Sequence, residues 1–313
     1  MQETDVSLKE LSLTIASSYP DAVWLADVDD TLTDTARMHS AASRSIVDVL
    51  VPTIAVSHAQ AISQRLDEIF QIMITFHQSA SQTDCAQAPE LRTLHDDFQR
   101  RISAYQAEIE EQWGVIRRFS REVLLKLAGE DCGVDLTSAH IDRCIDHYWA
   151  YIMKHADCFS DAVRLTETLE RIGSPLYLIT SSDGRMTLED NGQFSYDPDF
   201  SRRDKAARME HLRAKGIRYR KVFIGDPVDK PAPEFFRLAY AGIEHDLQRR
   251  LEPQKVIIVG DSYRSDLQTP VTERTAALGI HYRRGQDRVT HESDRIFSLG
   301  SLSVVSDLLI SLQ

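Results

Sequence analysis

Short apolar runs of strand length recur along the chain, and each one stops at a polar residue or at glycine. An uninterrupted apolar run, as opposed to an alternating one, is typical of a strand that is buried on both faces of a parallel sheet. Helical patterns lie between these runs, so we expect a Rossmann-like, doubly wound α/β sheet whose ligands bind at the carboxyl edge of the strands. The predicted strands cover residues 22–26, 175–180, 222–224 and 256–259, and the predicted helices cover 161–172, 204–215, 233–241 and 266–278.

Residues 35–158 carry no strand pattern and have helical periodicity instead. Apolar residues recur there at steps of three and four, which places them on one face of a helix. The first two of these stripes flank a polar loop at 79–89 and predict an antiparallel helical hairpin with a near-heptad seam. The stripes lie within residues 62–76, 91–116 and 141–152.

The domain layout follows from this interruption of the strand pattern. We expect an all-helical domain at 35–158, inserted into an α/β core domain that is formed by 1–34 and 159–313. A smaller feature lies in the second core segment, where Asn191-Gly192 between two short runs at 186–196 predicts a β-hairpin. A division of the chain at its midpoint would therefore separate neither domain correctly.

Composition and charge limit the classes of function. The 48 acidic and 36 basic side chains leave a net charge of −12, so we expect no nucleic-acid partner. No apolar stretch reaches the length of a membrane span, and residues 1–20 lack the pattern of a secretory signal, so we expect no membrane partner. The cysteines contain no CxxC pair, which predicts reduced thiols in a cytoplasmic protein. These cysteines are Cys85, Cys132, Cys144 and Cys158.

Acidic residues gather directly after two of the predicted strands. Asp27, Asp29 and Asp30 follow the first strand, and Asp261 and Asp266 follow the fourth. Asp27 and Asp29 are two positions apart on an extended segment, so their side chains project to the same side. Taken alone, this first cluster also fits a solvated turn rich in Asp. The second cluster favours a shared Mg²⁺ ion, because gathered carboxylates repel one another without a cation and are the hard ligands that Mg²⁺ takes.

Groups suited to phosphate follow the other two strands. The second strand ends at Thr180 and Ser181, whose hydroxyl and N–H groups can donate to phosphate oxygens. Lys230 precedes Pro233, a residue that suits the first turn of a helix. Alone, Lys230 would be assigned to the solvated surface, but a lysine in an acidic pocket neutralises carboxylates and a phosphoryl group together. We interpret its neighbour Asp229 as a turn residue.

These four segments, in this order, resemble the haloacid dehalogenase-like (HAD) hydrolase superfamily. The matching segments are DVDDT at 27–31, the strand that ends at Thr180, KPAPEFF at 230–236 and GDSYRSD at 260–266. The resemblance implies a Rossmann-like core with a mobile cap. The helical block 35–158 lies where a cap inserted after the first motif would lie.

The resemblance also implies roles for individual residues. Asp27 would be the nucleophile that forms an aspartyl-phosphate, which water then hydrolyses. Asp29 would be the general acid for the leaving alcohol and the general base for the water. The Mg²⁺ ligands would be Asp27, the main-chain carbonyl of Asp29, Asp261, and Asp266 directly or through water. The transferring phosphoryl group would be bound by Thr180, Ser181 and Lys230.

Asp29 distinguishes between branches of the superfamily. Dehalogenase members lack this second carboxylate because a halide leaves without a proton. We therefore expect a Mg²⁺-dependent phosphatase that acts on a small-molecule phosphate monoester. Two alternatives stay open: a phosphomutase that uses the same residues, and a weakly active protein whose helical domain mainly binds a partner. In the second case a homodimer would form through the helical domain.

Overall fold

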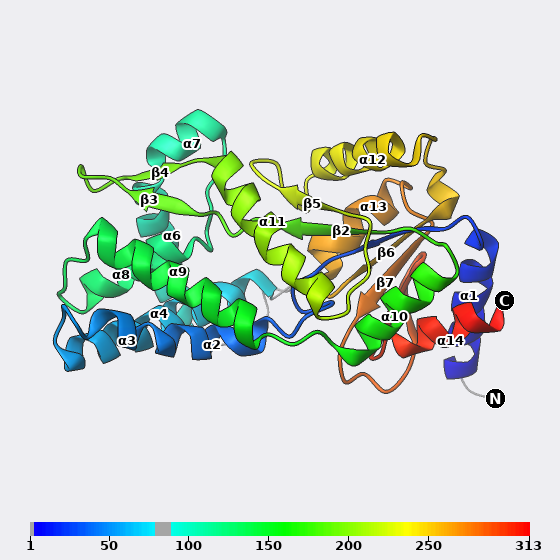
Figure 1. Ribbon diagram of the computed structural model, residues 1–313, viewed down its shortest axis with the longest axis horizontal. Helices are drawn as coiled ribbons and strands as arrows, with labels where there is room; N and C mark the ends of the chain where they lie inside the picture. Colours follow the sequence, from blue (N-terminus) through cyan, green and yellow to red (C-terminus); the bar gives the residue numbers. More distant parts are fainter. Residues whose placement is uncertain (1–2, 79–88) are drawn as a thin grey trace. The chain divides into compact units, whose positions relative to one another are not determined.

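The computed structural model describes residues 3–78 and 89–313, which fall into two compact units (Figure 1). Unit 1 is made of Met1–Thr35, Asp157–Ser181 and Ala206–Gln313. Unit 2 is made of Ala36–Ala156 and Ser182–Lys205. The predicted polar loop at 79–89 lies outside the described residues, apart from Pro89. Each unit is therefore assembled from separate segments of the sequence.

Unit 1 is built on a mostly parallel β-sheet. Within the described part of the chain this sheet has seven strands in the order β5-β2-β1-β6-β7-β9-β8. Neighbouring strands pair in parallel except for β8 and β9, which are antiparallel. The four predicted strands are confirmed as β1, β2, β5 and β6, and the α/β class with them. The strands are β1 Val23–Ala26, β2 Leu176–Ser181, β5 Lys221–Gly225, β6 Val256–Gly260, β7 Leu278–Tyr282, β8 Thr290–Ser293 and β9 Ile296–Leu299.

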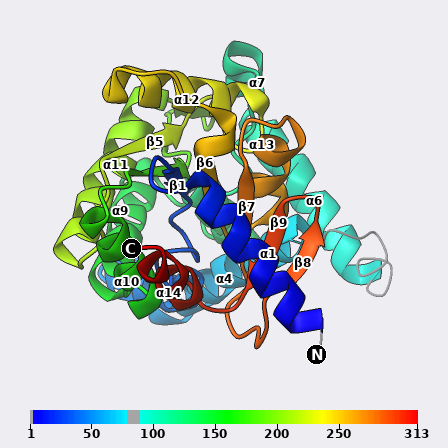
Figure 2. The same ribbon diagram turned by 90° about the vertical axis from the view of Figure 1, so that its right-hand side faces the viewer.

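Helices cover both faces of this sheet, which explains why its strands are apolar without interruption (Figures 1 and 2). In β1, Trp24 and Ala26 belong to the core on one face, whereas Val23 and Leu25 belong to the core on the other. The first face is covered by α1 Glu3–Ser18, α10 Ser160–Arg171, α11 Pro198–Ala214 and α14 Ser303–Ser311. The second face is covered by α12 Pro233–Leu247, the π-helix η2 Tyr263–Gln268 and α13 Thr269–Thr272. A 3₁₀ turn, η1 Pro253–Lys255, precedes β6.

The predicted helix at 266–278 is wrong in its second half. After α13 the chain adopts a φ of 56° at Arg274, and a left-handed residue ends a right-handed helix. The N–H of Ala277 then donates to Val256 O at 2.9 Å, which joins the chain to the sheet and starts β7. The apolar residues that resemble the end of a helix in the sequence therefore belong to a strand. Strands β7, β8 and β9 are not among those that the apolar pattern predicts.

The helices of unit 2 enclose a separate hydrophobic core. Every element that the structure describes in segment 36–156 is a helix, as predicted. Helix α4 packs against α2, α6 and α8, so the predicted two-helix seam is one contact within a larger bundle. The single helix predicted over 91–116 breaks at Gln106, whose side chain accepts from Arg117 N at 2.7 Å and donates to Arg117 O at 3.0 Å. The helices are α2 Ala36–Ser45, α3 Val47–Leu50, α4 Val56–Gln78, α6 Pro89–Tyr105, α7 Ala107–Trp113, α8 Arg121–Asp131 and α9 Ser138–His155.

Residues 182–205 belong to unit 2, whereas the sequence pattern assigns them to the core domain. Their hairpin is confirmed, because β3 Met186–Leu188 pairs antiparallel with β4 Phe194–Tyr196. The apolar side chains of both strands lie in the core of unit 2. Nearby, Nε of the buried Arg185 donates to Glu122 Oε1 at 2.6 Å. The segment is therefore a second insertion, and it adds a small sheet to the helical unit.

The sequence also leads us to expect reduced cysteines and no membrane-spanning segment. Cys132, Cys144 and Cys158 are free thiols, and Cys85 lies outside the described residues. Over 3–78 and 89–313, no helix is long and apolar enough to cross a membrane.

Candidate active site

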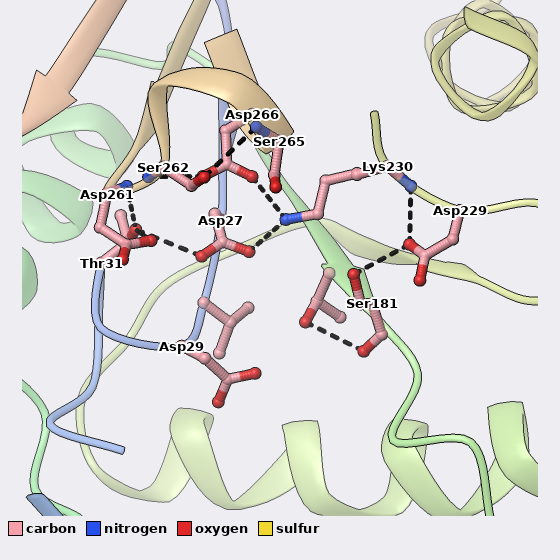
Figure 3. A network of polar contacts seen from close by, with 12 residues as sticks. Asp27, Asp29, Thr31, Ser181, Asp229, Lys230, Asp261, Ser262, Ser265 and Asp266 are labelled. Carbon is pink, nitrogen blue, oxygen red and sulfur yellow. Dashed lines mark hydrogen bonds and ion pairs between the residues drawn. The ribbon is translucent and has the colours of Figure 1, made fainter. Parts of the chain in front are cut away.

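The chemistry-bearing residues of unit 1 gather at the carboxyl edge of the sheet (Figure 3). Strand β1 lies between β2 and β6, so the residues that end or follow these three parallel strands are neighbours at one edge. Asp27 follows β1, Thr180 and Ser181 end β2, and Asp261 follows β6. The main chain of Asp27 still takes part in the sheet, because its N–H donates to Val259 O at 2.9 Å. The carboxylate of Asp27 is therefore held in the middle of this edge.

Lys230 joins two of the acidic strand ends. Its Nζ lies 2.5 Å from Asp27 Oδ1 and 2.7 Å from Asp266 Oδ1. The exposed fractions of the three side chains are 5%, 8% and 1% for Lys230, Asp27 and Asp266, so these ion pairs are buried. A buried charge needs a close partner to offset its loss of hydration. Lys230 is thus part of the site and not a surface lysine.

Thr31 connects the loop after β1 to the loop after β6. Its Oγ1 accepts a hydrogen bond from Asp261 N at 2.9 Å and lies 3.3 Å from both Asp27 Oδ2 and Asp261 Oδ1. A hydroxyl has a single hydrogen, so Thr31 donates to one of these carboxylates at a time. Sequence reasoning did not single out this residue, although it stands within the DVDDT segment. Its side chain fixes how closely the two acidic loops approach.

Three carboxylates form a candidate site for a divalent cation. Asp27, Asp261 and Asp266 each offer an oxygen, and these oxygens lie within 4.8 Å of one another. Carboxylates are hard ligands of the kind that Mg²⁺, Ca²⁺ and Mn²⁺ take. Asp266 is also engaged by protein donors, because Ser262 N donates to its Oδ2 at 3.1 Å while Lys230 occupies Oδ1. The donor set fits a divalent metal, and Asp261 is the least engaged of the three, because only the hydroxyl of Thr31 lies near its carboxylate, at 3.3 Å.

Burial and mutual repulsion disturb the titration of these groups. Burial raises the pKa of Asp27 to about 7, against the opposing effect of Lys230 and with a further rise from Asp266. Burial also raises the pKa of Asp261 well above its ordinary value, and the carboxylates of Asp27 and Asp266 add to the rise. For Lys230, burial acts to lower the pKa, but Asp266 and Asp27 outweigh it and leave the pKa above its ordinary value. The lysine is therefore charged, and a further cation would stabilise the ionised acids.

The carboxylate of Asp29 lies apart from this group (Figure 3). It accepts a hydrogen bond from Thr35 Oγ1 at 2.9 Å, and Thr35 Oγ1 lies 2.8 Å from Thr33 Oγ1. The chain turns at Asp30, which has a φ of 60°, and Asp30 N donates to Thr33 O. The prediction that Asp27 and Asp29 project to the same side does not place both carboxylates in one group. If Asp29 binds a metal at this site, its ligand atom is therefore the main-chain carbonyl oxygen.

Asp229 links the end of β2 to the lysine loop. Its Oδ1 accepts from Ser181 Oγ at 2.9 Å and from Lys230 N at 2.7 Å (Figure 3). The sequence pattern predicts a turn residue at Asp229, and the position of Asp229 next to Lys230 is the signal in the sequence that points to this role. Because Ser181 directs its single hydroxyl hydrogen at Asp229, that hydrogen is already engaged. The hydroxyl of the buried Thr180 makes a longer contact, 3.4 Å to Ser181 O.

Comparisons with known proteins bear on the fold. No family model matches the sequence, and no curated protein matches it. A magnesium-bound protein assigned as a HAD-hydrolase, YfnB from Bacillus subtilis, is 14% identical, covers 92% of this chain and 98% of its own, and has a TM-score of 0.50. A protein assigned as a beta-phosphoglucomutase, from Thermotoga maritima, is also 14% identical, covers 93% of this chain and 100% of its own, and has a TM-score of 0.52. At this identity the likeness concerns the fold: the chain has the fold of HAD hydrolases, as the order of its motifs predicts.

Proposed function

We propose that the protein is a Mg²⁺-dependent phosphatase that hydrolyses a small-molecule phosphate monoester through an aspartyl-phosphate on Asp27. The observation that carries this proposal is the bridge of Lys230 Nζ between Asp27 and Asp266, at 2.5 and 2.7 Å, beside Asp261. One strand edge thereby combines a carboxylate nucleophile, a cation for phosphoryl oxygens and hard oxygen ligands for a divalent ion. Phosphoryl transfer depends mostly on positioning and on charge stabilisation, which these groups can supply.

Asp27 attacks phosphorus in its ionised form. One carboxylate oxygen bonds to phosphorus while the bond from phosphorus to the ester oxygen breaks. A water oxygen then bonds to phosphorus, the bond to Asp27 breaks, and inorganic phosphate leaves with the carboxylate regenerated. Burial raises the pKa of Asp27 to about 7, so only part of this carboxyl group is ionised at neutral pH. A cation close to the carboxylate lowers the pKa and thereby increases the ionised fraction.

The metal site would use Asp27, Asp261 and the main-chain carbonyl of Asp29 as ligands. Mg²⁺, when bound, supplies positive charge that stabilises the phosphoryl oxygens. Both oxygens of Asp266 already accept hydrogen bonds, from Lys230 and from Ser262 N. We therefore assign Asp266 to a link through water and to the orientation of Lys230.

Asp29 transfers the proton. It protonates the ester oxygen as the alcohol leaves, and it then accepts a proton from the attacking water. Its carboxylate stands outside the group of Asp27, Asp261 and Asp266, so it is not committed to the metal. The hydrogen bond from Thr35 at 2.9 Å fixes the direction in which this carboxylate points.

Lys230 and Thr180 bind the phosphoryl group. A lysine ammonium has three hydrogens, and two of those of Lys230 face Asp27 and Asp266, which leaves the third for a phosphoryl oxygen. The hydroxyl of Thr180 stands at the end of β2, next to the nucleophile's strand. Ser181 would have to release Asp229 in order to donate to phosphate, so we assign it to the positioning of Asp229 and Lys230.

The experiment measures phosphate release from p-nitrophenyl phosphate and from a panel of metabolite phosphates. We expect turnover with Mg²⁺, none with EDTA, and none for Asp27→Asn. Asp21→Asn is the matched control, because Asp21 is exposed just before β1 and should leave activity unchanged. Activity that persists in EDTA or in Asp27→Asn contradicts the proposal. A phosphomutase would instead convert a sugar phosphate to its isomer without release of phosphate.

A further inference from the structure

A histidine on the neighbouring strand contacts the main chain of Asp261. His281 lies on β7, which pairs in parallel with β6, and it stands opposite Gly260 in the register. Its Nε2 lies 2.9 Å from Asp261 O, and its Nδ1 lies 2.7 Å from Glu292 Oε2. A carbonyl oxygen can only accept, so Nε2 carries hydrogen and donates to Asp261.

The far side of His281 is anchored as well. Glu292 belongs to β8, and its other oxygen lies 3.3 Å from Arg283 Nη1. The side chains of His281 and Glu292 are 12% and 18% exposed, so their contact is shielded from water. The ring of Tyr263 packs edge-on against His281 at 6.1 Å between centroids. The imidazole therefore has little freedom to leave Asp261.

Both peptide groups of Asp261 are thereby held by side chains. Thr31 Oγ1 accepts from Asp261 N at 2.9 Å, and His281 donates to Asp261 O at 2.9 Å. An aspartate side chain has only two rotatable bonds, so the orientation of its flanking peptides largely determines where its carboxylate lies. This matters here because the neighbouring carboxylates of Asp27 and Asp266 repel that of Asp261. Without a fixed main chain, the loop could relax and move the carboxylate away from the group.

We propose that His281 is a positioning residue for the metal site, which orients the Asp261 carboxylate through its main-chain carbonyl and is itself oriented by Glu292. The inference rests on the proposed function only in that Asp261 binds a divalent cation. Groups that hold a metal ligand in place commonly affect metal affinity by about 10–100-fold when they are removed. A role restricted to the packing of β7 against β6 would alter stability without this effect on affinity.

The test measures binding of Mn²⁺, as a spectroscopic substitute for Mg²⁺, by calorimetry and by electron paramagnetic resonance, without substrate. We expect His281→Phe, which keeps the ring shape but removes the donor, to weaken Mn²⁺ binding by about tenfold. His281→Gln places an amide donor near the position of Nε2, and we expect its Mn²⁺ affinity to stay close to that of the unmodified protein. Glu292→Gln should fall between the two. Thermal unfolding without metal verifies that each variant is folded.

His291→Phe is the matched control. His291 lies on β8, its side chain is 45% exposed, and its ring stacks on Phe297 at 4.7 Å, so its loss should leave Mn²⁺ affinity unchanged. Folded His281→Phe and Glu292→Gln variants with unaltered Mn²⁺ affinity would overturn the proposal, as would an unmodified protein that binds no Mn²⁺. A protein that binds Mn²⁺ in this graded way but releases no phosphate would support the role of His281 and contradict only the phosphatase.

Discussion

Lys230 Nζ lies 2.5 Å from Asp27 Oδ1, although the two residues are 203 positions apart in sequence. The contact joins two loops at the carboxyl edge of the sheet, because Asp27 follows β1 and Lys230 lies in the loop after β5. The same ammonium group reaches Asp266, which follows β6. One buried cation therefore holds together two segments, those of Asp27 and Asp266, whose like charges would otherwise drive them apart.

The replacement Lys230→Met tests this dependence. It leaves the buried carboxylates of Asp27 and Asp266 without their cation, and loss of one partner of a buried ion pair costs about 3–5 kcal/mol of unfolding free energy. Urea denaturation in EDTA measures the effect, and added Mg²⁺ should restore part of the loss. Lys9→Met is the control, since Lys9 is exposed on α1. An equal free energy of unfolding for Lys230→Met and the unmodified protein would mean that these ion pairs do not contribute to stability.

The raised pKa of Asp27 predicts how Mg²⁺ stabilises the protein as pH changes. Burial raises this pKa to about 7 in the folded, metal-free protein, above the unfolded value of about 3.9. Between these values the folded state binds more protons than the unfolded state, so the contribution of Asp27 to stability falls as pH rises. Mg²⁺ binds the ionised form, and we expect the increase in melting temperature that it causes to grow from pH 5 to about pH 7 and then level off.

The melting temperature with and without Mg²⁺, recorded at several pH values, checks this prediction. In Asp27→Asn the group cannot titrate, so the pH dependence of the Mg²⁺ effect over this window should weaken, and the part that remains belongs to Asp261, whose pKa burial also raises. The same slope in Asp27→Asn as in the unmodified protein would assign the effect to another acid.

Thr35→Val tests the orientation of Asp29. The variant loses the 2.9 Å hydrogen bond to Asp29 Oδ1 while the size of the side chain is kept. We expect kcat to fall by roughly tenfold with little change in KM, less than the 10²–10⁴-fold expected for complete loss of a general acid. The fall should be larger for an alkyl phosphate than for p-nitrophenyl phosphate, because nitrophenolate leaves without a proton. Thr187→Val, at an exposed position of β3, is the control. An identical fall in kcat/KM for both substrates would count against protonation of the leaving group by Asp29.

Arg185→Met tests the attachment of the second insertion to the helices of unit 2. Arg185 pairs with the buried Glu122 at 2.6 Å and with Asp146 at 2.8 Å. Without its partner, buried Glu122 should lower the stability of unit 2 by about 3–5 kcal/mol, and Arg185→Met with Glu122→Gln should recover part of this. Hydrogen exchange measured peptide by peptide distinguishes the units: protection should fall in α8, α9 and β3 but not in β1 or β6. An equal fall in both units would contradict a local role.

The sheet could be predicted from sequence because a strand buried on both faces has an uninterrupted apolar pattern. Residues 256–259 are such a case, and β6 covers Val256–Gly260. The apolar pattern does not predict the structure correctly where the same apolar residues fit either the end of a helix or a strand. The run near Leu278 resembles the end of a helix, and its pairing with the neighbouring strands β6 and β9 makes it β7.

The sequence predicts which residues form the candidate site, but it does not predict which partner each side chain contacts. The sequence brings Asp27, Asp261 and Lys230 to one edge, since parallel strands end together. It does not reveal that Asp29 turns toward Thr35, because that depends on the left-handed turn at Asp30. The partnership of Ser181 with Asp229 and that of Asp261 with His281 depend likewise on side chains that meet only in the folded sheet.

In the proposed reaction, Asp27 carries the phosphoryl group between the two chemical steps. Rapid acid quench during turnover with Mg²⁺ traps an aspartyl-phosphate, and reduction with borohydride converts the phosphorylated aspartate to homoserine, which peptide mass spectrometry locates. We predict homoserine at position 27, and none in EDTA or in Asp27→Asn. Phosphate release with no conversion at Asp27, or conversion at a different acid, would contradict the account.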